Sequence, residues 1–309
     1  MRIAVMGSGA VGGYFGAKLA DAGHAVAFVA RGRHLAALRE RGLKIESPSG
    51  DLLVRDALFA ADPGRVGNVD LVLFCVKSYD SEAAARAIAP MVSENTNILS
   101  LQNGVDNPEI LARHYGRERV LPGVVYLGAQ LTAPGLVTHS TGGKIVFGRL
   151  NPVSDEPQKP LAETFIAAGI PCEASAEIGK VQWTKLLWNA PFCAISCLTN
   201  SDTLEIVESP SLRQLALACM SEVQAAARTA QIELPDELRE STLAFARTLG
   251  HFKPSMRQDL EARKRLEFEA FNGSVVRRLA AARQNAPINR TFYEMLQFLD
   301  ERIRKERDR

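Results

Sequence analysis

The sequence lacks several features that would place it in a specialised class of protein. Its formal net charge is only +2 over 309 residues, which gives no reason to expect a nucleic-acid or membrane partner. No apolar run approaches the roughly 18 residues of a membrane-spanning helix. The N-terminus has one basic residue followed by a glycine-rich turn, which is not the pattern of a signal peptide. We therefore expect a cytoplasmic protein.

Cysteine is scarce and irregularly placed. The 5 cysteines are odd in number, scattered along the chain and free of C-x-x-C spacing. This distribution fits neither a disulfide framework nor a metal site. We expect reduced, mostly buried thiols and no bound metal.

The N-terminal stretch carries the most informative motif. An apolar run over residues 2–6 leads into Gly7-Ser8-Gly9-Ala10-Val11-Gly12, and a helical pattern and a second apolar run follow. A G-x-G-x-x-G between a strand and a helix is the fingerprint of dinucleotide binding. In that fingerprint Gly7 allows the tight turn, Gly9 lets the backbone approach a pyrophosphate, and Gly12 lets helix and strand pack closely. The helix N-terminus then offers N–H groups to the phosphates. We expect residues 7–12 to bind the cofactor.

A missing carboxylate indicates which dinucleotide is bound. Proteins that bind NAD place Asp or Glu about 20 residues after the fingerprint, on the ribose hydroxyls. Here no carboxylate lies between Asp21 and Glu40, and the second apolar run ends instead at Arg31. A planar, permanently charged guanidinium suits a 2′-phosphate. The sequence therefore predicts NADP(H), although Arg31 and Arg33 could also be ordinary surface charges.

Length and pattern predict two domains. Apolar and helical stretches alternate up to about residue 174, which is typical of an α/β domain with a doubly wound parallel sheet. A hairpin is expected over 43–46 and 52–55. Beyond residue 176 glycine becomes scarce and the apolar spacing is helical. We expect a Rossmann-type domain over 1–176 and an all-α domain over 177–309, with helices over 181–198, 211–232, 235–249, 255–285 and 291–304.

Polar residues follow two of the predicted strands. Lys77 comes after the apolar run 70–76, and Asn103 follows the run 97–101 within Gln102-Asn103-Gly104. Ligands of open α/β sheets bind at the carboxyl ends of the strands. Both residues are therefore candidates for the site, although Lys77 could equally belong to an exit turn.

Two stretches of the helical domain carry polar residues that a simple core would not need. Lys185 and Asn189 are four residues apart and share one helix face among apolar neighbours. Such surroundings disfavour the charged form of a lysine, which is one way to make a general acid for neutral pH. A lysine with a solvated head is the alternative. The second stretch begins at Ser255 and contains three carboxylates, and spacing does not decide which of them matters.

Taken together, these motifs resemble the ketopantoate reductase (2-dehydropantoate 2-reductase) family over nearly the whole chain. The resemblance implies a Rossmann domain followed by a helical domain like the C-terminal domain of 6-phosphogluconate dehydrogenase. It also implies NADPH-dependent reduction of the 2-oxoacid ketopantoate to D-pantoate, a step of pantothenate biosynthesis. The motifs occur in this order: Gly7 to Gly12, Lys77, Gln102-Asn103-Gly104, Trp183-x-Lys185-Leu186-x-x-Asn189, Ser255-Met256-x-x-Asp259, Glu267 and Asn272-Gly273.

The resemblance assigns roles to individual residues. Lys185 would give the proton to the ketone oxygen as hydride arrives, and a positioned ammonium suits the negative charge that builds there. Glu267, also catalytic, would lie beside cofactor and substrate. The remaining assignments are Asn103, Lys185, Asn189 and Ser255 to the substrate, Lys77 and Asn103 to the nicotinamide end, and Ala129 to the loop lining it.

The chain departs from the family pattern at its substrate pocket. Cys193 and, approximately, Thr203 and Phe252 stand where the family has asparagine, and Asp80 stands where it often has glutamine. We expect the chemistry to be retained and the pocket altered. One alternative is a D-2-hydroxyacid dehydrogenase that reduces a less polar 2-oxoacid, and another is a nucleotide-binding regulatory protein without turnover. A homodimer is an expectation that the sequence leaves open.

Overall fold

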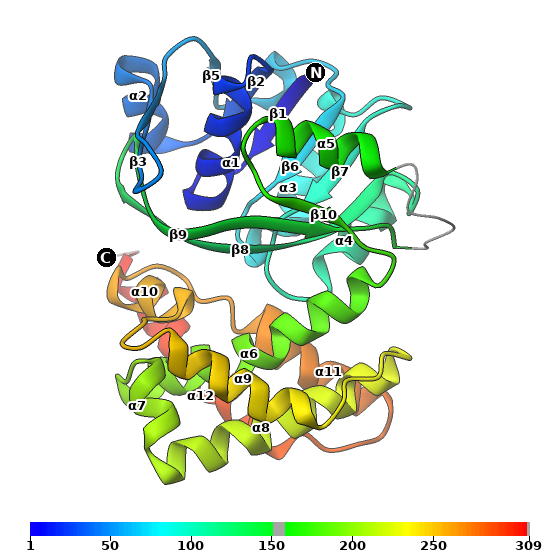
Figure 1. Ribbon diagram of the computed structural model, residues 1–309, viewed down its shortest axis with the longest axis vertical. Coiled ribbons are helices and arrows are strands. Elements are labelled where there is room, and N and C mark those ends of the chain that lie inside the picture. Colours follow the sequence, from blue (N-terminus) through cyan, green and yellow to red (C-terminus); the bar gives the residue numbers. More distant parts are fainter. Residues whose placement is uncertain (151–157, 308–309) are drawn as a thin grey trace. The chain divides into compact units, whose positions relative to one another are not determined.

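The chain folds into two compact units in this computed structural model, which describes residues 1–150 and 158–307 (Figure 1). The first unit comprises Met1–Gln102 and Asn107–Ile178, and the second comprises Asn103–Asp106 and Gly179–Arg309. The short segment Asn103–Asp106 therefore belongs to the helical unit, although the chain on both sides of it belongs to the first.

A 10-stranded sheet forms the centre of the first unit, in the order β4-β3-β9-β8-β7-β6-β1-β2-β5, with β10 paired to β9. The strands from β5 to β8 in this order are parallel, as the doubly wound fold requires. The strands are β1 (Arg2–Met6), β2 (Ala25–Val29), β3 (Leu43–Glu46), β4 (Leu52–Val54), β5 (Leu58–Ala60), β6 (Leu71–Phe74), β7 (Asn97–Ser100), β8 (Val120–Ala133), β9 (Leu136–Phe147) and β10 (Cys172–Ala174).

The sheet as a whole is mixed, because antiparallel pairs extend its doubly wound parallel part. The long strands β8 and β9 run side by side as an antiparallel pair (Figure 1). The predicted hairpin is confirmed, because β3 and β4 pair antiparallel. Only two residues, Pro134 and Gly135, separate β8 from β9, so the chain reverses direction there instead of crossing over.

Both faces of the parallel part are buried. Along β6, Leu71 and Leu73 join one apolar core, and Val72 and Phe74 join another. Helices cover both faces, as expected for parallel strands with continuous apolar sequences. The helices of this unit are α1 (Ala10–Asp21), α2 (Gly32–Arg41), α3 (Ser81–Ala87), α4 (Asn107–Tyr115) and α5 (Lys159–Ala167), with short 3₁₀ turns η1 (Pro63–Arg65), η2 (Ser78–Asp80) and η3 (Ala89–Met91).

The second unit is built of helices around a third apolar core, as predicted. No helix in the described ranges is long and apolar enough to cross a membrane. The elements are α6 (Ile178–Thr199), α7 (Thr203–Glu208), α8 (Pro210–Thr229), α9 (Glu237–Thr248), α10 (Ser255–Glu261), the π-helix η5 (Glu269–Gly273), α11 (Ser274–Ala281) and α12 (Pro287–Arg307).

The helix expected over 255–285 is broken, so that prediction was wrong. The chain leaves α10 through Arg263, whose φ of 53° ends the helical path. The buried carboxylate of Asp300 on α12 then accepts a hydrogen bond of 2.8 Å from the Leu266 N–H. A partner from a distant helix thus stabilises the break, and the local sequence alone gave no signal for it.

Candidate functional site

The glycine-rich loop has the geometry of a dinucleotide-binding turn. Gly7 has a φ of +97°, and a Cβ there would lie 2.8 Å from the Val76 nitrogen. A Cβ on Gly12 would lie 2.3 Å from the Gly7 oxygen, so helix α1 packs tightly on the loop. At Gly9, in contrast, a Cβ would meet nothing within 4 Å. Close packing at Gly7 and Gly12 and open space at Gly9 fit a loop that a pyrophosphate approaches.

The other residues of the loop hold it in place or begin the helix. Ser8 is 2% exposed, and its hydroxyl and its N–H donate to the Val29 carbonyl over 3.0 and 3.2 Å. Helix α1 begins at Ala10, so Ala10 and Val11 lie in its first turn, where N–H groups have no partner within the helix. The loop can therefore bind an anion through its backbone.

Three predicted cofactor residues follow neighbouring parallel strands. Gly7 follows β1, Arg31 comes two residues after the end of β2, and Lys77 comes three residues after the end of β6. Arg31 is 79% exposed at its side chain, and one guanidinium nitrogen lies 3.0 Å from a carboxylate oxygen of Asp80. The sheet thus brings the three residues to one edge, with the cation of Arg31 balanced by Asp80.

Ala129 does not lie in a loop. It is part of strand β8 and pairs with His139 of β9. The prediction that Ala129 belongs to a loop was wrong, because β8 stays paired with β9 on both sides of it despite an irregularity between Gly128 and Ala129.

Lys185 is the principal titratable group of the helical unit. It lies on α6, and its partial burial lowers its pKa to about 8. The Cys193 thiol and the Glu267 carboxylate act in the opposite direction, so both lie within electrostatic range of the ammonium. A lysine with this pKa can donate a proton near neutral pH.

Asn189 lies one helical turn after Lys185. It is 4% exposed, and its Nδ2 group has no hydrogen-bond partner among the residues that the structure describes. A buried donor without a partner costs stability, and a bound substrate oxygen would supply the missing acceptor. Lys185 and Asn189 therefore fit the predicted substrate site.

Glu267 is placed by the break between α10 and η5. It is 4% exposed and follows Leu266, the residue anchored by Asp300. The π-helix η5 begins two residues later, and its Asn272 donates to the Ala190 carbonyl over 3.2 Å. Segments of this kind often occur at functional sites. The contact joins the glutamate-bearing segment to the lysine-bearing helix.

The segment of Asn103 is also fixed to the helical unit. A Cβ on Gly104 would lie 2.8 Å from the Ala270 oxygen, so the segment packs directly on η5. Asp106 pairs with Arg278 over 2.6 Å, and the Arg278 guanidinium lies 5.4 Å from the ring centre of Trp183. Asn103 is therefore held in the same unit as Lys185 and Glu267.

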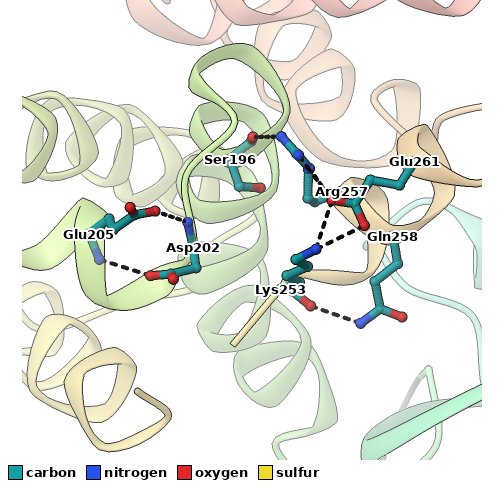
Figure 2. A network of polar contacts seen from close by, with 7 residues as sticks. All are labelled: Ser196, Asp202, Glu205, Lys253, Arg257, Gln258 and Glu261. Carbon is teal, nitrogen blue, oxygen red and sulfur yellow. Dashed lines mark hydrogen bonds and ion pairs between the residues drawn. The ribbon is translucent and has the colours of Figure 1, made fainter. Parts of the chain in front are cut away.

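Ser255 is exposed and is the first residue of α10. Figure 2 shows a polar network formed by the residues next to it in the sequence: Arg257 donates to the Ser196 carbonyl of α6 over 3.1 Å and pairs with Glu261 over 2.9 Å. Lys253 also pairs with Glu261 over 2.9 Å. These contacts hold the start of α10 against α6, the helix of Lys185.

The three positions that depart from the family pattern have few polar groups to offer. Cys193 is fully buried. The Thr203 hydroxyl donates to the Gly250 carbonyl over 2.7 Å, and the Phe252 ring packs 6.3 Å from that of Trp188. Thr203 is thus engaged within the fold, and Cys193 and Phe252 are apolar.

Comparison with known proteins agrees with this geometry. Residues 3–152 match the family model "Ketopantoate reductase PanE/ApbA", and residues 177–300 match its C-terminal counterpart. The chain belongs to the ketopantoate reductase family. The 2-dehydropantoate 2-reductase of Halobacterium salinarum is 32% identical over 96% of this chain and 98% of its own. A crystal structure of a ketopantoate reductase from Ralstonia eutropha is 35% identical, with a TM-score of 0.91 over 98% of this chain and all of that one.

Family membership places the chain among oxidoreductases that act on CH–OH groups. The ketopantoate reductase fold also occurs in a D-mandelate dehydrogenase with NADH and anilino(oxo)acetate, at a TM-score of 0.91 over 98% of this chain and 99% of that one. That protein is 21% identical, so the likeness concerns the fold alone. The predicted fold class is confirmed.

Sequence reasoning missed the residues that position the site. Asp300, Asp106 and Arg278 act on Glu267 and Asn103 through contacts between elements far apart in the sequence. Spacing could not have found these contacts, because each depends on the packing of the helical unit.

Proposed function

We propose that this protein is an NADPH-dependent reductase of a 2-oxoacid, with ketopantoate as substrate and D-pantoate as product. The observation that carries the proposal is Lys185, whose pKa is lowered to about 8 by burial, in electrostatic contact with Glu267 and one turn from the unpartnered Nδ2 of Asn189. A proton donor and a hydrogen-bond donor thus meet on one face of α6. This arrangement suits a carbonyl that becomes an alcohol.

The reaction needs a hydride and a proton. When bound, NADPH supplies the hydride to the carbonyl carbon of the substrate. Lys185 holds the proton at Nζ and gives it to the carbonyl oxygen, which becomes the hydroxyl. Asn189 and Ser255 bind polar groups of the oxoacid, and Asn103 and Lys77 are assigned to the nicotinamide end.

The test is direct. Purified protein with NADPH and ketopantoate should consume the reduced nicotinamide and form D-pantoate in equal amounts, as followed by absorbance and chiral chromatography. Tight binding of NADPH with no reduction of any 2-oxoacid would contradict the proposal. That outcome would instead support the regulatory alternative.

A second candidate is the reduction of a less polar 2-oxoacid to a D-2-hydroxyacid. It is favoured by Cys193, Thr203 and Phe252, which are apolar or already hydrogen-bonded. A site without partners for a substrate hydroxyl loses its preference for that hydroxyl. Values of kcat/KM for ketopantoate, a branched-chain 2-oxoacid and phenylglyoxylate would decide. Cys193→Asn should shift the ratio of kcat/KM values toward ketopantoate, because the new amide can pair with a substrate hydroxyl.

The rate should depend on pH through Lys185. A general acid works only when protonated, and the pKa of Lys185 is lowered to about 8. We therefore expect kcat/KM to be highest below this value and to fall about tenfold per pH unit above it. Glu267 raises the pKa of Lys185, so Glu267→Gln should move this decline to lower pH. Glu269→Gln, at an exposed position nearby, is the control and should leave the profile unchanged.

Cofactor preference should depend on the pair of Arg31 and Asp80. Loss of the guanidinium removes a charge-assisted hydrogen bond to a 2′-phosphate, so Arg31→Ala should lower the preference for NADPH over NADH by about tenfold or more. Asp80→Gln should raise that preference, because its carboxylate lies 3.0 Å from the guanidinium and opposes a bound phosphate. Dissociation constants for both cofactors provide the measurement. If Arg31→Ala raised the dissociation constants of NADPH and NADH by the same factor, Arg31 would not bind the 2′-phosphate. The control is Arg33→Ala, at an exposed position two residues away.

A further inference from the structure

His34 of α2 joins two parts of the first unit that are distant in the sequence. Its Nε2 lies 2.7 Å from the Ser8 carbonyl oxygen in the glycine-rich loop. Its Nδ1 accepts a hydrogen bond of 3.0 Å from the N–H of Gly135, in the turn between β8 and β9. The imidazole thus bridges the cofactor loop and the turn of the long hairpin.

The two partners fix the protonation state of this imidazole. Gly135 offers an N–H, which can only donate, so Nδ1 must carry a lone pair. Ser8 offers a carbonyl, which can only accept, so Nε2 must carry the proton. Both bonds exist together only for the neutral ring with its proton on Nε2. A second proton on Nδ1 would face the Gly135 N–H and break that bond.

The turn is a fixed support for the histidine. The Gly135 carbonyl accepts a hydrogen bond of 2.9 Å from the Lys44 N–H of β3. A Cβ on Gly135 would lie 3.3 Å from the Cβ of Ala37, so the turn also packs on α2. His34 therefore ties the Ser8 carbonyl to a point that β3 and α2 already hold.

The contact with Ser8 sets the direction of the next amide. The chain has no cis peptide in its described part, so the carbonyl of Ser8 and the N–H of Gly9 point in opposite directions from one planar unit. The Gly9 N–H makes no hydrogen bond to another described residue, and the space beside Gly9 is open. Holding the carbonyl of Ser8 against His34 aims this amide away from His34.

We propose that His34 is a positioning residue of the cofactor site, which orients the Gly9 N–H toward the pyrophosphate and does so only in its neutral form. This inference rests on the proposed binding of a nicotinamide dinucleotide. Acid protonates His34, releases the Gly135 N–H and loosens the loop. Cofactor affinity therefore falls on the acid side.

The surroundings of His34 agree with a neutral ring. Burial lowers the pKa of His34 and is the larger cause, and the bond to Ser8 raises it. Charged groups on the neighbouring elements have other partners: Arg31 pairs with Asp80, Lys44 pairs with Glu46, and Arg39 donates to the Phe59 carbonyl. Strand β5, which packs on α2, has no titratable side chain.

Two variants separate the effect of the His34 hydrogen bonds on cofactor binding from the effect of His34 protonation. The terminal amide of His34→Gln can donate to Ser8 and accept from Gly135, but it does not titrate. His34→Leu can do neither. The dissociation constant for NADPH, measured by nicotinamide fluorescence without oxoacid from pH 5.5 to 8, is the readout, with thermal unfolding as the check on folding.

At pH 7.5 we expect His34→Leu to weaken NADPH binding about three- to tenfold, the worth of one or two hydrogen bonds. His34→Gln should bind nearly as the wild type does. The 2′-phosphate of NADPH itself titrates near pH 6, so the affinity of every variant changes with pH. The decisive quantity is therefore the difference between wild type and His34→Gln in how much NADPH affinity each loses in acid. The wild type should lose more affinity than His34→Gln on acidification. The matched control is His114→Gln, which removes a histidine outside the cofactor loop. Its NADPH affinity should change with pH as that of the wild type does.

The outcomes distinguish this inference from the proposed function. If His34→Leu unfolds at a lower temperature but keeps its affinity, His34 is structural only and the inference is overturned. It is also overturned if wild type and His34→Gln lose affinity equally in acid. If the wild type binds neither NADPH nor NADH at any pH, the proposed function fails and the inference fails with it.

Discussion

Replacing Lys185 with methionine should lower kcat for the 2-oxoacid by about 10²- to 10⁴-fold, the usual contribution of a general acid. Methionine keeps the length and apolar character of the side chain and removes only the ammonium. Burial already disfavours the charge of Lys185, so the variant should fold at least as well as the wild type. NADPH affinity should stay within about twofold, because the glycine-rich loop belongs to the other unit.

The control for this prediction is Lys264→Met. Lys264 is exposed and lies three residues before Glu267, so it tests whether any loss of positive charge in this region slows turnover. It should leave kcat unchanged. Near-normal turnover in Lys185→Met, measured under single-turnover conditions, would remove Lys185 from the reaction.

Two glycine variants should separate cofactor binding from folding. Gly9→Ala adds a methyl group into open space, so the thermal unfolding temperature should not change. That methyl group occupies the side from which a pyrophosphate would approach, so the dissociation constant for NADPH should rise about tenfold or more.

Gly12→Ala should behave differently. Its Cβ would lie 2.3 Å from the Gly7 oxygen and 2.7 Å from a Val5 methyl group. Neither a backbone oxygen nor a buried strand can move away easily, so stability should fall by about 1–3 kcal/mol, as measured by urea unfolding. Equal effects of the two variants on stability would contradict the roles assigned to Gly9 and Gly12.

Residues that act through the local chain could be predicted from the sequence. The strand, turn and helix around Gly7 to Gly12 follow from apolar runs and glycine positions, and the hairpin of β3 and β4 follows from its turn residues. The shared face of Lys185 and Asn189 follows from helical spacing, since both lie on α6. Each of these inferences needs only neighbours a few residues apart.

Residues that depend on packing could not be predicted in this way. The break before Glu267 needs Asp300, which lies more than 30 residues further along the chain. Helix α7 was missed, although Asp202 and Glu205 form a capping box at its start that the sequence does display. The pairing of Asp80 with Arg31 became evident only in the structure, because the two residues are far apart in the sequence. Burial and ion pairing therefore decide most of the site beyond the fingerprint.

The segment Asn103–Asp106 has a consequence for how members of this family can be recombined. The chain passes between the two units three times, after Gln102, after Asp106 and after Ile178. A chimera joined near residue 177 would take Val105 and Asp106 from one parent, and their packing partners and Arg278 from the other. Exchange of the helical half between relatives must therefore include these four residues, and the smallest transferable catalytic module is discontinuous in the gene.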